Sequence, residues 1–244
     1  MKIGHFATDY KRLVAGLKGR SDEATAMARA VGGSYDAIGQ IESDLLRMYG
    51  LRDGMRLIDL GCGSGRAATA LARDFQIEYH GTDVVPDLLD YARRNTPATY
   101  RYSVVDKIEI PDTDACADMV CAFSLFTHLL HDETYIYLEE VKRVLKPGGT
   151  LVFSFLEFRI GPHWAVFRDT VKQAKAGQRP HLNMFIERNA IEAWARQLDM
   201  TIVDWQDSAE GPRIPLSRDV VTDGGQAMTG MAILGQSVCV MAKR

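Results

Sequence analysis

Three alternate glycines, Gly61, Gly63 and Gly65, stand between a short apolar run at 57–60 and a segment rich in helix-forming residues at 66–73. This order predicts a buried strand, a tight turn and a helix. Glycines leave the backbone N–H groups of such a turn uncovered, and the N-terminus of the helix carries a partial positive charge. We therefore expect the turn to bind an anionic group of a ligand.

The same pattern limits which ligand the turn can take. The dinucleotide fingerprint G-x-G-x-x-G requires a third glycine where this chain has Arg66, which disfavours a nicotinamide-dependent oxidoreductase. The sequence lacks the phosphate loop G-x-x-x-x-G-K-[ST], which disfavours nucleotide hydrolysis. An acidic residue, Asp83, ends the second predicted strand, where a carboxylate can accept hydrogen bonds from both hydroxyls of a ribose. The turn and the acid together indicate a ligand that contains adenosine.

Two histidines follow the fourth predicted strand, His128 and His131 in the stretch SLFTHLLHDET. The unperturbed pKa of imidazole suits the removal of a proton near neutral pH, so both histidines are candidate catalytic bases. A histidine in such a place is also often a solvated or helix-capping residue. The sequence leaves both interpretations open.

From residue 55 onward, strand-like runs alternate with helical patterns, which predicts a parallel sheet covered by helices on both faces. The predicted strands are 55–60, 77–82, 100–105, 118–124 and 150–155. One helix is predicted to begin at Pro86, and another to be capped by Asp132. The second of these ends at the Lys-Pro-Gly-Gly stretch 146–149, a sharp exit into the next strand.

The segments on either side of this alternation carry weaker signals. Residues 1–54 have helical spacing interrupted by Gly32-Gly33, and we expect them to form a helical cover over the sheet edge. Beyond residue 155, the predicted helices are 163–176 and 189–198, and the predicted strands are 201–205 and 238–242. The sequence has no internal repeat and no linker-like composition, so we expect a single domain over 1–244.

The composition is that of an ordinary soluble enzyme. The 244 residues are 46% hydrophobic and 25% charged, with a net charge of −3, and this slightly acidic balance makes a large nucleic-acid footprint unlikely by electrostatics. No apolar run reaches the length of a membrane span and the N-terminus lacks a leader pattern, so we expect a cytoplasmic protein. The four cysteines form no C-x-x-C pair, so the sequence indicates neither a disulfide framework nor a metal site.

Five elements between 57 and 155 follow one another in a specific order. They are Asp-Leu-Gly-Cys-Gly-Ser-Gly at 59–65, Gly-Thr-Asp at 81–83, Val-Asp at 105–106, the run 118–124, and Leu-Lys-Pro-Gly-Gly at 145–149. In these elements the chain resembles the class I S-adenosylmethionine-dependent methyltransferases. The resemblance implies a doubly wound, Rossmann-like α/β fold with a seven-stranded, mainly parallel sheet whose last strand is antiparallel. It also implies that S-adenosylmethionine binds at the carboxyl ends of the first strands and leaves as S-adenosylhomocysteine.

The resemblance further implies roles for individual residues. The glycine turn would receive the methionine part of the cofactor, Asp83 the ribose, and Asp106 the adenine, with Lys107 nearby. Phe123 and Ser124 would close the pocket near the reacting methyl group. The full predicted cofactor-binding set is Asp59, Gly61, Cys62, Gly63, Ser64, Gly65, Asp83, Val84, Asp106, Lys107, Phe123 and Ser124. Of these, Asp59 is expected to order the glycine loop and Cys62 to offer only its backbone.

On this interpretation the chain divides into an N-terminal helical cover at 1–54, a cofactor-binding core at 55–155, and an acceptor-side insertion with the last strands at 156–244. The expected reaction is direct displacement of the methyl group onto a small-molecule or glycan acceptor. A hydroxyl is the favoured acceptor group, because only a hydroxyl demands proton removal and a histidine follows the fourth strand. N-methylation of a small metabolite, methylation of protein, RNA or lipid, and cofactor binding without catalysis remain alternatives.

Two further groups of residues have both a structural and a functional interpretation. The segment 157–183 is rich in basic residues and histidines, which form either a solvated helix face or a cover for an anionic acceptor, such as one that carries a phosphate. Tyr10, Tyr35 and Gln40 in the N-terminal segment are candidates to close over the cofactor and exclude water.

Overall fold

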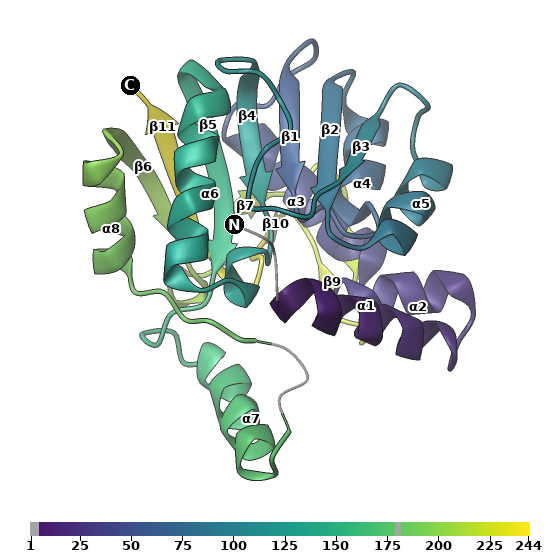
Figure 1. Ribbon diagram of the computed structural model, residues 1–244. Helices are drawn as coiled ribbons and strands as arrows, with labels where there is room; N and C mark the ends of the chain where they lie inside the picture. The colour runs from purple at the N-terminus through teal and green to yellow at the C-terminus, as the bar shows by residue number, and fades with distance from the viewer. Residues whose placement is uncertain (1–4, 179–181) are drawn as a thin grey trace.

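A computed structural model describes residues 5–178 and 182–244 and is built around a seven-stranded sheet (Figure 1). The strand order is β3-β2-β1-β4-β5-β11-β6, and β11 runs antiparallel to both of its neighbours. The strands are β1 Arg56–Leu60, β2 Glu78–Asp83, β3 Arg101–Val104, β4 Ala117–Ala122, β5 Leu145–Phe155, β6 Met200–Gln206 and β11 Ser237–Lys243. The predicted Rossmann-like sheet with an antiparallel last strand is therefore confirmed.

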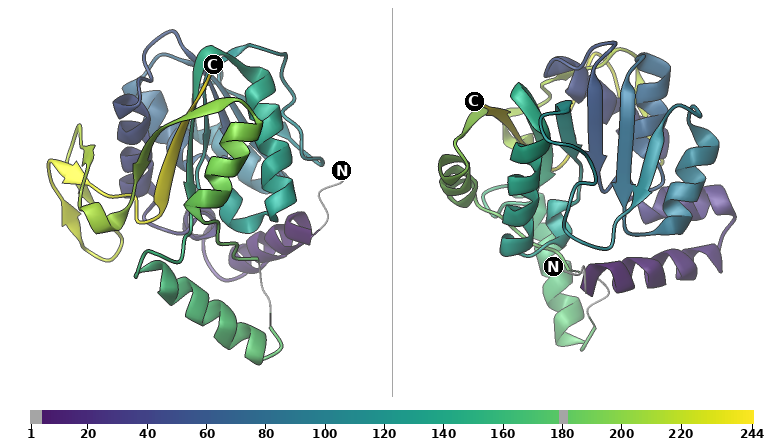
Figure 2. Two further views of the ribbon diagram at one scale, coloured as in Figure 1. Left: turned by 90° about the vertical axis from the view of Figure 1, so that its left-hand side faces the viewer. Right: turned by 45° about the horizontal axis from the view of Figure 1, so that its top comes forward.

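Helices cover both faces of the sheet, as the left view of Figure 2 shows. One face carries α3 Tyr35–Met48, α4 Arg66–Asp74 and α5 Pro86–Asn95, and the other carries α6 His131–Val144 and α8 Arg188–Gln197. Alternate side chains of a strand point to opposite faces, so Leu57 of β1 packs with the first helix layer while Ile58 packs with the second. This double burial explains why the first strand is apolar almost throughout.

The junction between α6 and β5 differs from the prediction in two ways. β5 begins at Leu145 and not at Thr150, because the stretch 146–149 bulges out of the ladder between the pairs Ala117–Leu145 and Met119–Thr150. The predicted cap Asp132 lies inside the first turn of α6, and the N-cap position is Leu130. The carboxylate of Glu133 accepts the Leu130 N–H at 2.7 Å, which satisfies one of the unpaired donors at the start of the helix.

The N-terminal segment divides into two parts. The helices α1 His5–Lys18 and α2 Glu23–Ala30 lie across the carboxyl ends of the strands (Figure 1), and we call them the α1–α2 cover. The third helix, α3, belongs instead to the layer on the sheet face. A Cβ atom on Gly39 of α3 would lie 2.5 Å from the carbonyl oxygen of Arg66, so this glycine lets α3 and α4 approach closely.

The segment after β5 adds α7 His163–Lys175, which projects from the same end of the molecule as the α1–α2 cover (Figure 1). Between β6 and β11 the chain forms two small antiparallel pairs that the sequence does not predict, because two-residue strands show no periodicity. These pairs are β7 Ile214–Pro215 with β10 Met231–Ala232, and β8 Val220–Val221 with β9 Ala227–Met228. Throughout the described residues, the helices fall short of the length and hydropathy that crossing a bilayer requires.

Candidate active site

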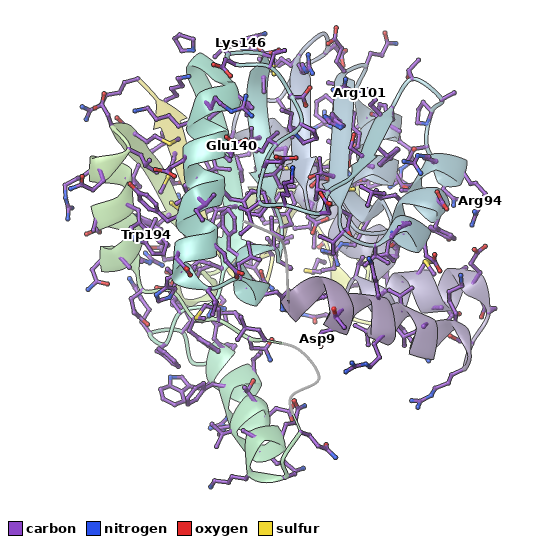
Figure 3. All side chains as sticks on the ribbon, in the orientation of Figure 1. Asp9, Arg94, Arg101, Glu140, Lys146 and Trp194 are labelled. Carbon is purple, nitrogen blue, oxygen red and sulfur yellow. The ribbon has the colours of Figure 1, made fainter. Side chains whose placement is uncertain are left out.

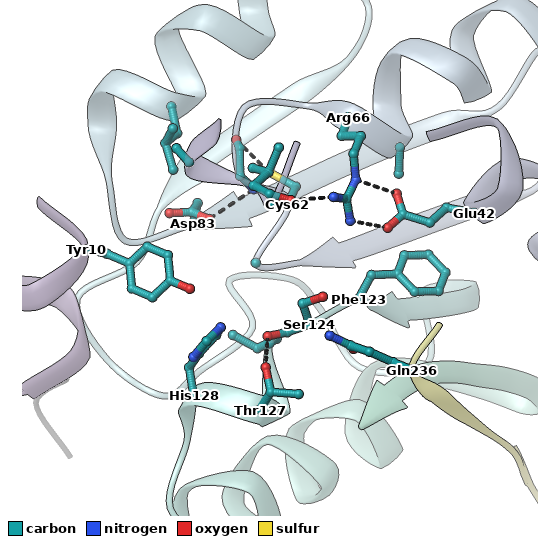
Figure 4. Close-up of a pocket in the computed structure, with 18 of the residues that line it drawn as sticks. Tyr10, Glu42, Cys62, Arg66, Asp83, Phe123, Ser124, Thr127, His128 and Gln236 are labelled. Atoms are coloured by element: carbon teal, nitrogen blue, oxygen red, sulfur yellow. Dashed lines mark hydrogen bonds and ion pairs between the residues drawn. The ribbon is translucent and has the colours of Figure 1, made fainter. Parts of the chain in front are cut away.

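A cavity of about 480 Å³ opens at the carboxyl ends of β1, β2 and β4 (Figure 4). Its wall is formed by the α1–α2 cover, the glycine turn, the end of β2, the loop after β4, the start of α7 and the loop before β11. A volume of this size holds a ligand of several hundred daltons, and the carboxyl ends of the strands are the usual binding edge of a doubly wound sheet.

The glycine turn needs glycine for its backbone and for close packing. Gly61, Gly63 and Gly65 have φ angles of 68°, 56° and 83°, in the left-handed region that other residues rarely adopt. A Cβ atom on Gly63 would lie 2.6 Å from Cγ1 of Val31, at the end of α2. Gly61, Cys62 and Gly63 line the cavity. The turn therefore needs glycine both for its left-handed backbone beside the cavity and for close contact with the α1–α2 cover.

Asp83 joins the end of β2 to the glycine turn. Its carboxylate accepts the N–H of Gly63 at 3.0 Å and the N–H of Val85 at 2.9 Å, and burial raises the pKa of the group. A carboxylate has about four lone-pair directions, so two hydrogen bonds leave it able to accept two more on the cavity side. Asp83 thus orders the turn and still offers the acceptor atoms that a ribose diol needs. Val84 lines the cavity beside it.

Asp59 is buried at the wall of the cavity and is hydrogen-bonded to β2. The hydroxyl of Tyr79 donates to its carboxylate at 2.7 Å, and burial raises the pKa of Asp59 to about 7. This hydrogen bond runs to a neighbouring strand and not to the glycine loop that Asp59 was expected to order. The thiol of Cys62 is buried, and burial raises its pKa well above the ordinary value, which leaves its backbone as the polar part near the turn.

Arg66 and Glu42 form a buried ion pair that the sequence analysis does not predict. The Arg66 guanidinium donates to both oxygens of the Glu42 carboxylate and to the carbonyl oxygen of Val31. Figure 4 shows this fork at one end of the cavity. Arg66, which stands where a dinucleotide fingerprint has its third glycine, therefore connects α3 and the end of α2 to the glycine turn.

The loop after β4 brings Phe123, Ser124 and His128 to the cavity. Ser124 has φ 58°, a strained value for a residue other than glycine, and its backbone is held on both sides. Its N–H donates to Oγ of Ser154 at 2.7 Å, and its carbonyl oxygen accepts the hydroxyl of Thr127 at 2.6 Å. Strain that is fixed by hydrogen bonds on both sides is typical of functional sites.

His128 lies at the end of the short helix η1 Phe126–His128, and its ring points into the cavity (Figure 4). Nδ1 lies 2.7 Å from the carbonyl oxygen of Leu182. A carbonyl oxygen can only accept, so Nδ1 carries the proton and Nε2 is the accepting nitrogen of the neutral ring. The Tyr10 ring packs edge-on against the imidazole with 5.2 Å between centroids, which fixes the ring from the α1 side.

Tyr10 is the residue of the α1–α2 cover that reaches furthest into the site. Figure 4 shows its hydroxyl directed into the cavity, between Asp83 and His128. Burial raises the pKa of the phenol, so it stays protonated at neutral pH. The other two predicted closing residues do not line the cavity. Tyr35 donates to the Ser64 carbonyl at 2.7 Å, and Gln40 donates to Asp74 at 2.9 Å.

Four predicted cofactor-binding residues are not part of the cavity wall. Ser64 is fully buried and donates to the Met27 carbonyl at 3.0 Å, and Gly65 caps α4. Asp106 and Lys107 are exposed, because β3 ends at Val104 and the chain turns their side chains outward. Val105 faces the cavity instead. The adenine contact of Asp106 and Lys107 stays a prediction.

His131 lies away from the cavity, in contrast to His128. It is the first residue of α6 and is exposed. Nε2 is 3.2 Å from the carbonyl oxygen of Phe185, and the ring packs edge-on against Trp194 at 5.6 Å. Figure 3 places Trp194 on α8, away from α1, which carries Asp9. His131 therefore joins α6 to α8, and its predicted catalytic role has no support from its position.

The remaining part of the wall lies beyond the loop after β4. It is formed by Leu156, Pro162, His163, Val166, Asn183, Gly235 and Gln236. The basic residues of α7, Arg168, Lys172 and Lys175, are exposed and are not part of it. A neutral His163 ring is satisfied in place, because Nε2 donates to the Gly235 carbonyl at 3.1 Å while Nδ1 accepts the Glu157 N–H at 3.1 Å.

Residues 58–153 match the family described as a methyltransferase domain. A malonyl-[acyl-carrier protein] O-methyltransferase from Serratia marcescens is 32% identical over 187 residues, which cover 72% of this chain and 68% of that protein. The chain belongs to the class I S-adenosylmethionine-dependent methyltransferases. A demethylmenaquinone methyltransferase from Deinococcus radiodurans is 38% identical over 121 residues, which cover 46% of this chain and 48% of that protein.

Solved methyltransferases share the fold over nearly the whole chain. A complex between the Haloferax volcanii Trm112 methyltransferase activator and a methyltransferase contains a chain with a TM-score of 0.64 and 20% identity, covering 97% of this chain and 96% of that one. Magnesium protoporphyrin IX methyltransferase from Synechocystis, solved with bound S-adenosylhomocysteine, has a TM-score of 0.57 and 15% identity. The match covers 97% of this chain and 94% of that one. The family match and the relative from Serratia marcescens identify the chain as an enzyme that uses S-adenosylmethionine, as the sequence analysis predicts.

Proposed function

We propose that this methyltransferase methylates a hydroxyl oxygen on a small molecule with an apolar body. The observation that carries the proposal is the orientation of His128, whose Nδ1 is held by the Leu182 carbonyl so that Nε2 serves as the accepting nitrogen on the cavity side of the ring. This arrangement suits a base that takes the proton of a hydroxyl. The relative named as an O-methyltransferase supports oxygen as the acceptor atom.

The residues of the first two strands fit the cofactor. We assign the backbone of Gly61, Cys62 and Gly63 to the methionine part, because the turn has no side chain that would block it. The two remaining acceptor directions of Asp83 suit the ribose hydroxyls. The neighbouring apolar wall, which includes Val84 and Val105, suits the adenine ring. When bound, S-adenosylmethionine supplies a methyl group on a positively charged sulfur, which is activated for displacement.

The chain's own contribution to the reaction is orientation and proton removal. Tyr10 packs against His128 and stays protonated, so it closes the site and holds the imidazole at one angle. His128 would accept the proton of the hydroxyl as the oxygen becomes the nucleophile. The strained backbone of Ser124 fixes the loop that carries His128 relative to the end of β4.

The mouth of the cavity favours an apolar acceptor body over a glycan. Leu13 of α1 and Val166 of α7 line the cavity and are also 36% and 37% exposed. The buried Leu156 continues this apolar wall inward, and the exposed Pro162 adds to the mouth. Since the basic residues of α7 face solvent, we do not propose an acceptor phosphate. The relative named for demethylmenaquinone supports an apolar small molecule.

A transfer experiment tests the proposal. Purified protein is incubated with methyl-labelled S-adenosylmethionine and an extract of the source cells, and the label is separated into organic-soluble, glycan, nucleic-acid and protein fractions. We expect the label in the organic-soluble small-molecule fraction. Label that enters only the protein or nucleic-acid fraction would overturn the proposal, and a glycan product would refute the apolar acceptor.

A further inference from the structure

Gln236 is a polar residue of the cavity wall that neither the sequence motifs nor the proposed base accounts for. It precedes β11 and is half-buried. Its Oε1 accepts the hydroxyl of Ser154 at 2.6 Å, and Ser154 is a fully buried residue of β5. Oγ of Ser154 in turn accepts the N–H of the strained Ser124 at 2.7 Å. A short hydrogen-bond chain therefore connects the cavity loop after β4 to the side chain of Gln236.

This chain determines which end of the amide faces the cavity. The Ser124 N–H can only donate, so Ser154 receives a proton there and has one hydroxyl proton to give. If the amide of Gln236 were reversed, the buried hydroxyl of Ser154 would receive two donors and its own proton would lose its acceptor, which costs free energy. Oε1 is thus directed at Ser154, and Figure 4 shows the amide nitrogen pointing into the cavity beside Ser124.

The amide nitrogen is a donor without a protein acceptor. Within 5–178 and 182–244, no group accepts a hydrogen bond from Nε2 of Gln236. The other amide in the wall differs, because the NH₂ group of Asn183 already donates to the hydroxyl of Thr170 at 2.9 Å. Gln236 therefore presents up to two N–H groups to a ligand, from a side chain whose other end is fixed.

Charge indicates what these N–H groups recognise. Among the described residues, the arginines that line the cavity are Arg66, which is paired with Glu42, and Arg29, which is exposed on α2. In the acceptor-side wall, at 123–128, 156–178 and 182–236, no lysine or arginine lines the cavity. Burying an anionic group there would lack a countercharge, whereas a neutral oxygen needs only a hydrogen-bond donor.

We propose that Gln236 donates a hydrogen bond to a neutral carbonyl oxygen of the acceptor, so that the substrate is a hydroxy-carbonyl compound. This assignment rests on the proposed function, because it places the carbonyl in the same cavity as the hydroxyl that faces His128. Gln236 positions the acceptor and sets specificity, and the Ser124–Ser154–Gln236 chain couples that position to the loop that carries the base.

Gln236→Glu is the informative variant. It keeps an oxygen that can accept from Ser154, but it replaces the donating NH₂ by a carboxylate oxygen that repels a carbonyl. Gln226→Glu is the matched control, since Gln226 is exposed just before β9 and does not line the cavity. Calorimetric titration with S-adenosylhomocysteine should give the same Kd for wild type and both variants, which also shows that the variants fold.

The acceptor readout uses the organic-soluble extract of the source cells as a dilution series, with label transfer measured for each protein. We expect Gln236→Glu to raise the apparent KM for the extract about 10- to 100-fold and to change kcat less, while Gln226→Glu behaves as wild type. Equal apparent KM values in Gln236→Glu and wild type would overturn the assignment of Gln236 and leave the proposed function standing. No transfer by wild type into this extract would overturn the proposed function and the assignment with it.

A pair of inhibitors gives a second measurement. The compounds 4′-hydroxyacetophenone and 4-ethylphenol differ only in the exchange of a carbonyl for a methylene group. We expect wild type to be inhibited at least about tenfold more strongly by the carbonyl compound, and Gln236→Glu to lose this preference. Absence of a preference in wild type, or a preference that survives in Gln236→Glu, would contradict the proposal.

Discussion

Replacing Asp83 by alanine tests the placement of the cofactor. The carboxylate makes two hydrogen bonds to backbone N–H groups, at 3.0 Å to Gly63 and 2.9 Å to Val85, and two acceptor directions remain for the ribose. Hydrogen bonds to a charged group contribute about 1.5–3 kcal/mol. We therefore expect Asp83→Ala to weaken binding of S-adenosylmethionine about 10- to 150-fold.

Isothermal titration of wild type and variant with S-adenosylmethionine measures this loss. Asp90→Ala is the control, because Asp90 is exposed on α5 and pairs only with Arg93 at 2.7 Å. Thermal unfolding of Asp83→Ala shows whether the glycine turn keeps its fold without the two hydrogen bonds. A folded Asp83→Ala that binds the cofactor within about twofold of wild type would refute the assignment of Asp83 to the ribose.

Three further substitutions have defined outcomes. His128→Ala should leave cofactor affinity unchanged, lower turnover about 10²- to 10⁴-fold and abolish the fall in rate at acidic pH. Unchanged turnover would show that His128 is not the base. Gly63→Ala should lower both the urea concentration at the unfolding midpoint and the cofactor affinity, because the added Cβ would lie 2.6 Å from Val31. Wild-type values for both quantities would contradict the close packing of Val31 on the turn. Asp59→Asn should gain stability relative to wild type as pH rises from about 4 to 7, measured by urea unfolding.

The sign of the Asp59 prediction follows from its raised pKa. The folded state holds the proton up to about pH 7, whereas the unfolded chain releases it near the ordinary value of 3.8. Between these values the folded state binds more protons, so the stability of wild type falls as pH rises, by at most about 1.4 kcal/mol per pH unit. Asparagine does not titrate. If the unfolding free energies of the two proteins changed with pH in parallel, Asp59 would not be protonated in the folded state over this range.

The parts of the cavity wall that the sequence locates are those that local patterns determine. The Gly61–Gly65 turn follows a strand and opens a helix, so spacing alone reveals its geometry, and Asp83 is found because it ends the next strand. The fold follows from the alternation of strand and helix patterns, and the family follows from the order of five short elements. None of these inferences needs a contact between distant segments.

The parts that the sequence does not predict depend on long-range contacts. The Glu42–Arg66 pair joins residues 24 positions apart, and the Ser154–Gln236 hydrogen bond joins residues 82 apart, so neither leaves a periodic signal. The cap of α6 was placed at Asp132 because an acidic residue suits a cap, yet Glu133 satisfies the Leu130 N–H from inside the helix. For the basic residues of α7, the sequence favours a solvated helix face over an acceptor cover, and in the fold Arg168, Lys172 and Lys175 are exposed.

We propose above that the enzyme methylates an oxygen of an acceptor bound in the cavity between the α1–α2 cover and α7. The most direct test is to run the reaction with ¹³C-methyl S-adenosylmethionine, isolate the labelled organic-soluble product and record the carbon shift and long-range couplings of its new methyl group. We predict an O-methyl signal, with long-range coupling across the oxygen to a carbon that lies near a carbonyl group. An N-methyl or C-methyl signal would contradict the account of His128 as the base.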